Sequence, residues 1–252
     1  VYPVVAWLFA SPLGSFELVV GCCIIATAPV TISSGTILTN YAGGNVSFSI
    51  LLCILTHFLA IFSIPFMLDS LLSTGSTIDL PILSILLGLI LKVLIPLVVG
   101  QISRPLVGRS IVRFTTHASI FQSCLILLMV AAAVSGSVES LQKMNAFMAV
   151  IVGVVIVLHL FMLLFNYLLA RLIRVDPGSL IVFTIHAPQK TLGVSYIVWA
   201  GFFAADYPGA FVPAIVCHLA QMISGTLIAE LFRKNSLAQR TFSAEDERGK
   251  SK

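Results

Sequence analysis

Long apolar runs separated by short polar segments dominate the sequence. Because a membrane-spanning helix needs about 20 apolar residues, each run of that length predicts a span. Five uninterrupted runs qualify, at residues 46–68, 80–99, 116–137, 146–170 and 209–231. The first ten residues are too short to span, and they begin at Val1 with neither Met nor a basic n-region, so they are interpreted as a stump of a helix whose start is missing, not as a signal peptide.

Two further apolar runs are interrupted by polar residues. Residues 16–45 contain TAPVTISSGT, and residues 179–205 contain HAPQKT. Proline removes one backbone donor and displaces another hydrogen bond, so each run is predicted to be a helix broken within the membrane. Freed backbone groups are tolerated there only against protein or a water-filled cavity, and paired broken helices are typical of a transporter's binding site.

Composition indicates a membrane protein, and the distribution of charge predicts which loops lie on the same side of the membrane. The chain is 58% hydrophobic and 10% charged, whereas soluble proteins have about a quarter charged residues. Alternate loops and the tail carry eleven Lys and Arg, against one in the loops between them, which predicts a cytoplasmic C-terminus. The tail, residues 232–252, carries net charge +3 and is predicted to be disordered and to touch anionic lipid. The Arg-rich loops need no nucleic-acid partner.

Other site chemistries find no support in the sequence. The five cysteines lack metal-type or redox-type spacing, so they are interpreted as small buried hydrophobic residues. No cofactor or metal site is expected. An intramembrane aspartyl protease would need two membrane Asp residues, and the spans contain none, so no enzyme is predicted.

The order of the spans suggests an inverted repeat. Each broken run is followed by one unbroken span, and the two breaks cross the membrane in opposite senses. The second five-helix unit is complete, so a matching first unit would begin roughly 75 residues before Val1.

Four collinear motifs resemble one family. GCCIIATAPVTISSGTILTNYAGGN resembles the broken fourth helix of the bile acid:sodium symporter superfamily (solute carrier family 10), in the branch containing the seventh member and fungal calcium-uptake regulators. LIPLVVGQISRP, HAPQKTLG and VPAIVCHLAQMISGTLIA resemble its sixth, ninth and tenth helices.

The resemblance implies an all-α polytopic membrane protein with inverted five-helix repeats, two crossing broken helices and an incomplete first repeat. Residues 11–68 and 146–231 would form the core domain, and residues 80–137 part of a panel domain; residues 1–10 would be the end of the third helix. The residues implied for solute or ion binding are Thr31, Ser33, Ser34, Asn45, His186, Gln189, Lys190 and Thr191. Thr36 and Thr39 are expected to bond the carbonyl one turn back.

Lys190 and His186 depart from the family's sodium site. The relatives hold sodium with a Gln-Asn pair and a nearby Glu, whereas here the pair is Gln189-Lys190 and the Glu position falls at Ile185 or His186. No Asp or Glu lies in the middle of a span. Lys190 is therefore expected to place its own charge where a coupling cation would sit, holding the crossing together or attracting an anionic solute. Alternatives are a proton carried by His186 and Lys190, or a purely structural clamp.

Two functions follow. The first is a secondary carrier of an anionic or amphipathic organic solute that works by alternating access without the usual sodium site. The second is a regulator of calcium homeostasis acting through a calcium-channel or regulatory partner, as the resemblance to the fungal proteins implies. Either would be an integral protein of the plasma membrane or the Golgi and other endomembranes, in contact with the lipid bilayer.

Overall fold

The computed structural model describes residues 1–73, 80–111, 115–143 and 145–250, and these are helical with short connections. The helices are α1 (Tyr2–Ala10), α2 (Phe16–Thr27), α3 (Ser34–Tyr41), α4 (Val46–Leu72), α5 (Ile82–Leu89), α6 (Ile95–Ile111), α7 (Thr115–Lys143), α8 (Asn145–Leu172), α9 (Pro177–Ile181), α10 (Leu192–Phe202) and α11 (Val212–Lys250). Short 3₁₀ turns are η1 (Ser11–Leu13) and η5 (Pro208–Phe211), and π turns are η2 (Ile90–Leu94) and η4 (Val182–His186). The predicted all-α polytopic membrane class is confirmed.

The uninterrupted spans predicted from the sequence form long helices. Within the described part of the chain, four apolar helical stretches are long enough to cross a membrane, at Val46–Leu72, Ile82–Ser103, Met148–Leu172 and Pro208–Asn235. The second runs through α5, η2 and α6. The remaining predicted span, 116–137, lies within α7. Large apolar side chains such as Phe58, Leu91 and Leu127 are exposed on these helices, which suits lipid contact.

Both predicted breaks are present. The first run is helical as α2, opens over residues 28–33 and resumes as α3; the second passes from α9 and η4 through residues 187–191 into α10. Near the exit of the first run, Gly43 has φ +78°, a left-handed conformation that glycine adopts without strain, as a tight turn requires. The predicted inverted symmetry between the two units stays a prediction.

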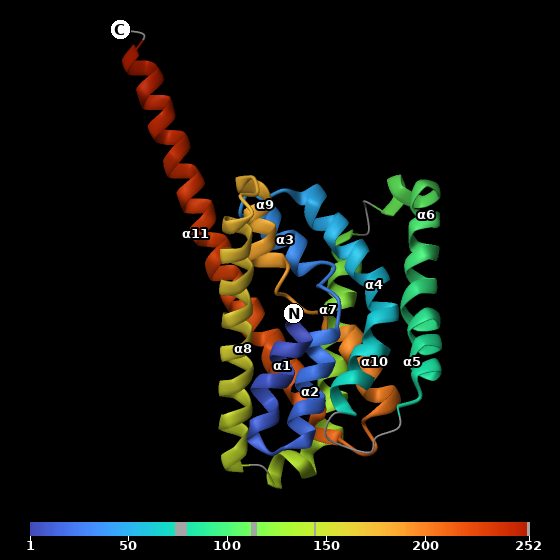
Figure 1. Cartoon of the computed structure of the whole chain (residues 1–252). Coiled ribbons are helices and arrows are strands. Elements are labelled where there is room, and N and C mark those ends of the chain that lie inside the picture. The colour runs from blue at the N-terminus through green and yellow to red at the C-terminus, as the bar shows by residue number, and fades with distance from the viewer. Residues whose placement is uncertain (74–79, 112–114, 144, 251–252) are drawn as a thin grey trace.

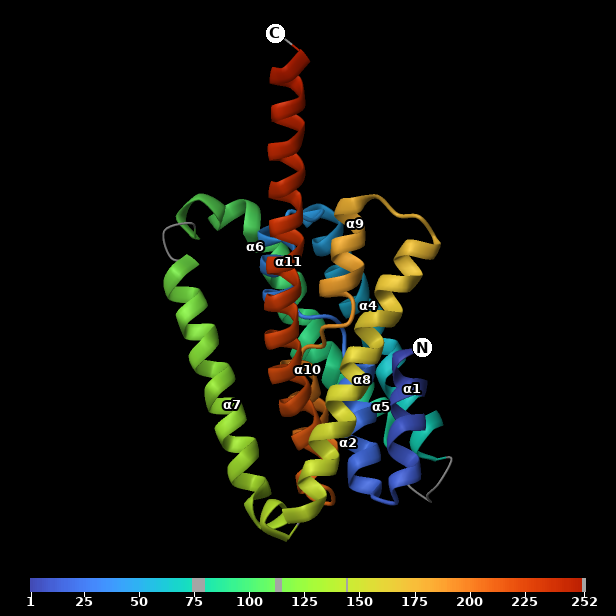
Figure 2. The ribbon, with the colours of Figure 1, turned by 90° about the vertical axis from the view of Figure 1, so that its left-hand side faces the viewer.

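The broken helices pack with α1, α4, α8 and α11 in one bundle (Figure 1). Figure 2 shows α7 standing apart from this bundle on one side. A large apolar cluster fills the half of the molecule that lies at the bottom of Figure 1, and Phe203, Phe211 and Leu18 are among its fully buried side chains. The small residues Cys22 and Cys23 let α2 pack closely among its neighbours, and four of the five cysteines are buried as predicted. Cys124 on α7 is exposed instead, so the prediction was wrong for it.

The Arg-bearing segments share one end of the molecule. The C-terminal end of α6, the α8–α9 connection with Arg171 and Arg174, and the C-terminus all lie at the top of Figures 1 and 2. This agrees with the alternation predicted from charge, while the side of the membrane stays a prediction. At this end Asp176 caps α9, and hydrogen bonds from Ser179 lower the pKa of its carboxyl. α11 continues as a helix to Lys250, through a segment rich in Ala, Arg, Glu and Lys, and the predicted disorder of the tail stays a prediction.

Candidate functional site

The two breaks meet and pair through their backbones. Val30 and Lys190 form an isolated antiparallel β-bridge. The Thr191 N–H donates to the Pro29 carbonyl at 3.0 Å, and the Thr31 N–H donates to the Gln189 carbonyl at 3.3 Å. Because proline interrupts both helices, backbone groups released by one break are satisfied by the other. The segments therefore hold each other at the centre of the bundle.

His186 lies fully buried between them. Its Nε2 is 2.7 Å from the Thr31 carbonyl oxygen, and its Nδ1 is 2.6 Å from the Ser49 hydroxyl of α4. The imidazole packs directly over Gly35, where any Cβ would overlap the ring. The site thus includes two partners, Ser49 and Gly35, that sequence analysis missed. Only Gly35's position near a break could have pointed to it.

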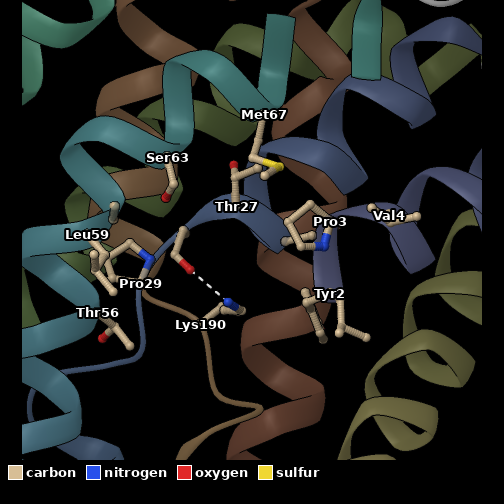
Figure 3. Close-up of a pocket in the computed structure, with 14 residues that line it drawn as sticks. Tyr2, Pro3, Val4, Thr27, Pro29, Thr56, Leu59, Ser63, Met67 and Lys190 are labelled. Atoms are coloured by element: carbon tan, nitrogen blue, oxygen red, sulfur yellow. Dashed lines mark hydrogen bonds between the residues drawn. The ribbon is translucent and has the colours of Figure 1, made fainter. Parts of the chain in front are cut away.

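Lys190 points away from His186, toward the end of α2. Its Nζ donates to the Ala28 carbonyl at 2.8 Å and lies 4.9 Å from the centre of the Tyr2 ring (Figure 3). Ala28 is the C-cap of α2, where helix carbonyls lack intrahelical partners and the helix dipole favours a positive charge. A cavity of about 350 Å³, here called the Lys190 pocket, adjoins it, with Thr27, Thr56, Ser63 and Met67 on its wall.

Gln221 of α11 fixes the backbone of Lys190. Its Oε1 accepts from the Lys190 N–H at 2.8 Å, and its Nε2 donates to the Lys190 carbonyl at 2.9 Å. The side chain is fully buried. Sequence analysis missed this residue, although a glutamine within an apolar span is a signal that could have found it.

Four predicted site residues gather on the side of the crossing that faces α7. Thr31, Ser33, Ser34 and Thr191 line a cavity of about 610 Å³, here called the α7 pocket. Its other wall includes Gln122, Leu125, Ile126 and Met129 of α7. The Gln122 Nε2 donates to the Ser33 Oγ at 3.1 Å and so joins the two walls. Thr31 Oγ1 and Ser34 Oγ are 2.8 Å apart.

The last two predicted residues are placed differently. Gln189 is buried at the crossing; its Oε1 accepts from Ser34 at 3.4 Å, while its Nε2 is buried without a partner. Asn45 is exposed at the start of α4, where its side chain accepts from the Phe48 N–H at 3.0 Å. The structure therefore does not bring Asn45 to the crossing.

The two neighbouring threonines behave differently from each other. Thr36 donates to the Ile32 carbonyl at 3.2 Å, as predicted. Thr39 is fully buried and its hydroxyl has no partner, so that prediction was wrong. Its methyl group, and not its hydroxyl, faces Gly44.

Comparison with known families decides the identity. The model of the SBF-like CPA transporter family matches residues 1–234, which include both breaks and the whole crossing. The chain belongs to this family. It is a membrane transporter family of the bile acid:sodium symporter type, as the four motifs indicated.

Individual relatives are distant. The probable sodium/metabolite cotransporter BASS4 of Arabidopsis thaliana is 28% identical over 236 residues, covering 86% of this chain and 52% of the relative. Sodium/bile acid cotransporter 7-B of Xenopus laevis is 25% identical and sodium/bile acid cotransporter 7 of Mus musculus 26%, covering 95% and 90% of this chain and 72% and 69% of the relatives. The chain spans about half the length of the plant relatives. The names of these plant and animal relatives mention no calcium, so the calcium-regulator alternative stays a prediction.

Proposed function

We propose that the protein is a secondary carrier of an anionic or amphipathic organic solute, and that the solute binds in the α7 pocket. The observation that carries the proposal is the composition of this cavity's walls. One wall carries hydroxyl groups from the two paired breaks beside Ile32 and Leu192, and the other is largely apolar and comes from α7. His218 and Met222 of α11 complete the lining. An amphipathic molecule fits such a cavity, and about 610 Å³ lies within the usual size of small-molecule sites.

Two helix N-termini favour an anionic group at the polar wall. Ser33 precedes α3 and Thr191 precedes α10, and neither side chain caps its helix. Helix N-termini carry partial positive charge, so an anion in this cavity gains favourable interactions with both. This is the arrangement expected of broken helices around a substrate carboxylate or sulfate.

Lys190 supports a transport cycle that does not use the usual sodium site. The C-terminal end of α2 would attract a cation, and the Lys190 ammonium already bonds its Ala28 carbonyl. Neither break contains Asp or Glu. Since carboxylates supply most of a site's attraction for a metal cation, a second cation beside Lys190 would be repelled without compensation.

The arrangement of the helices suggests how access would alternate. The bundle containing the crossing would move against α7 and against the continuous helical stretch of α5, η2 and α6. This motion would close the α7 pocket to one side of the membrane and open it to the other. In the structure Gln122 and Ser33 hold the two parts together across the pocket.

The proposal is tested with purified protein in liposomes and a radiolabelled steroid sulfate as probe. Uptake above that of protein-free liposomes is expected, with the same rate in sodium and choline buffers. The Ser33→Ala/Ser34→Ala double variant should lower probe affinity, whereas Ser103→Ala on α6, which bonds only its own helix, should not. Strictly sodium-dependent uptake would contradict the sodium-free cycle, and failure to move any anionic amphiphile would contradict the carrier.

A further inference from the structure

A line of hydroxyl groups connects His186 to a third cavity. This cavity of about 150 Å³, here called the α6 pocket, lies between the first broken helix, α4 and α6, and Thr36 and Gln101 are on its wall. Thr36 Oγ1 is 3.1 Å from Ser49 Oγ, and Ser49 Oγ is 2.6 Å from His186 Nδ1. The lining also includes His57, Cys53 and four Ile and Leu residues. Two hydroxyls therefore connect this cavity to a fully buried imidazole.

The imidazole can be satisfied in two protonation states. The Thr31 carbonyl can only accept, so the Nε2 beside it carries a hydrogen and the Nδ1 of the neutral ring accepts from Ser49. When a proton is added at Nδ1, the same contact reverses: Nδ1 donates to Ser49, Ser49 donates to Thr36, and Thr36 donates to the Ile32 carbonyl at 3.2 Å. Neither state leaves a ring nitrogen without a partner, which a buried group requires.

The titratable side chains on the elements packed against η4 do not fix the charge of this ring. Those whose side chains the structure describes are Tyr41 of α3, Cys53, His57 and Asp69 of α4, His159, Tyr167 and Arg171 of α8, and Cys217, His218, Glu230, Arg233 and Lys234 of α11, with Lys190 four residues along the chain. None of them, among the described residues, hydrogen-bonds the imidazole. Lys190 bonds Ala28, and Glu230 is engaged by Tyr41 and Arg233. No carboxylate therefore holds a proton permanently on His186, as a carried proton requires.

His186 is also connected to the proposed solute site. It closes the π turn η4, a form that is frequent at functional sites. Its partner Thr31 bonds Ser34 through its own hydroxyl, and both side chains line the α7 pocket. A change of charge at the imidazole would thus be felt by the residues facing the solute.

We propose that His186 is a proton-binding site loaded from the α6 pocket through Thr36 and Ser49, and that a proton is the ion coupled to solute movement. The coupling rests on the proposed carrier function. For the transfer, Ser49 turns its hydrogen from Thr36 to Nδ1, and Thr36 turns its hydrogen from the Ile32 carbonyl to Ser49. A hydronium ion in the α6 pocket then gives a proton to Thr36 Oγ1, Thr36 passes its hydroxyl hydrogen to Ser49, and Ser49 passes its own to Nδ1. Three O–H bonds break and two O–H bonds and one N–H bond form, leaving water and an imidazolium.

The coupling is tested in sodium-free liposomes with the membrane potential clamped. Accumulation of the steroid sulfate under a pH gradient is compared with its exchange at equal concentrations on both sides. For one coupled proton, the accumulation ratio can rise by about tenfold per pH unit. His186→Gln keeps a donor toward Thr31 but cannot take a proton, so the ratio of accumulation to exchange should fall about tenfold or more. Thr36→Val should lower it as well, whereas Thr226→Val, an equivalent back-bonded threonine on α11, should leave it unchanged. A wild-type ratio in His186→Gln overturns the coupling.

The proton site itself is tested without any solute. In protein labelled with ¹⁵N-histidine and held in lipid nanodiscs, the signals lost in His186→Gln identify this imidazole. They should show an Nε2–H tautomer at neutral pH and a doubly protonated ring on acidification. A ring that stays neutral throughout overturns the site, even where the steroid sulfate is transported. A titrating ring together with no transport of any anionic probe would instead refute the carrier function and leave the proton site standing.

Discussion

The two breaks differ in what they contribute to the crossing. The first, residues 28–33, supplies backbone carbonyls and hydroxyls and contains no ionisable side chain. The second, with the turn before it, supplies His186, Gln189 and Lys190. Each ionisable group of the second bonds a carbonyl of the first, His186 to Thr31 and Lys190 to Ala28.

This difference shows how a membrane protein can hold titratable groups without a carboxylate. A carbonyl freed by a broken helix is a strong acceptor that brings no charge of its own, so it stabilises a donor without neutralising it. The two donors stay separate as well, because they leave the crossing toward different cavities. A substitution that alters one break should therefore affect the contacts of the other.

The largest effect is expected for Gly35→Ala in the first break. Its Cβ would overlap the buried His186 imidazole, which has no free space to move into. Overpacking of this kind lowers the free energy of unfolding by ~1–3 kcal/mol, and more where the neighbour is fixed on both sides. Thermal unfolding of the purified protein in detergent should show a clear drop in midpoint.

Gly153→Ala on α8 is the matched control, because an added Cβ meets no neighbouring atom there. Combining Gly35→Ala with His186→Ala should recover part of the lost stability by removing the overlap. Equal unfolding midpoints for Gly35→Ala and Gly153→Ala would show that the imidazole does not rest on Gly35.

Lys190→Met separates charge from bulk in the second break. Methionine keeps an unbranched apolar stem but leaves the Ala28 carbonyl without its partner and removes the cation from the Tyr2 ring. A hydrogen bond to a charged group contributes ~1.5–3 kcal/mol, so a loss of about 2 kcal/mol in unfolding free energy is expected. Calorimetry measures it, and Lys92→Met on the exposed face of η2 is the control. If the Lys190→Met protein were as stable as the Lys92→Met protein, the Lys190 ammonium would not stabilise the crossing.

Gln221→Leu leaves both breaks unchanged in sequence and tests whether α11 aligns them. The change removes two hydrogen bonds from the backbone of Lys190, each contributing ~1 kcal/mol, so a loss of roughly 2 kcal/mol or less is expected. Ile223→Leu, exposed on the same helix, should be near neutral. Hydrogen exchange of the Lys190 amide should accelerate in Gln221→Leu, and an unchanged rate would contradict the clamp.

The spans and breaks could be predicted because they depend on properties local to the sequence. Apolar length sets a span, and proline within an apolar run sets a break. His186 and Lys190 could be predicted for the same reason, since ionisable residues stand out in an apolar segment. Asn45 could not be placed, because capping α4 satisfies its amide locally and nothing in its neighbours signals that outcome.

The partners of the site residues depend on packing between distant segments and therefore escaped prediction. Ser49 lies 137 residues from His186, and Gln221 lies 31 residues from Lys190. Serines and glutamines in membrane helices commonly bond their own helix or a neighbour, so the sequence does not say which of them reaches the crossing. The choice of Ala28 as the acceptor for Lys190 follows from where α2 ends, which only the fold determines.

The smallest effect on stability is expected for Gln122→Leu on α7. It breaks the bond to Ser33 that joins the walls of the α7 pocket, at a cost of about 0.5–1 kcal/mol because the glutamine is exposed to the cavity. The crossing itself is untouched, so its stability and the titration of His186 should match those of the wild-type protein. Solute exchange should change instead, because one contact between the moving parts has gone. Leu128→Met, exposed on the same helix and away from the pocket lining, is the control for exchange rates in liposomes. If Gln122→Leu altered the His186 titration and left exchange unchanged, α7 would belong with the crossing and not with the part that moves against it.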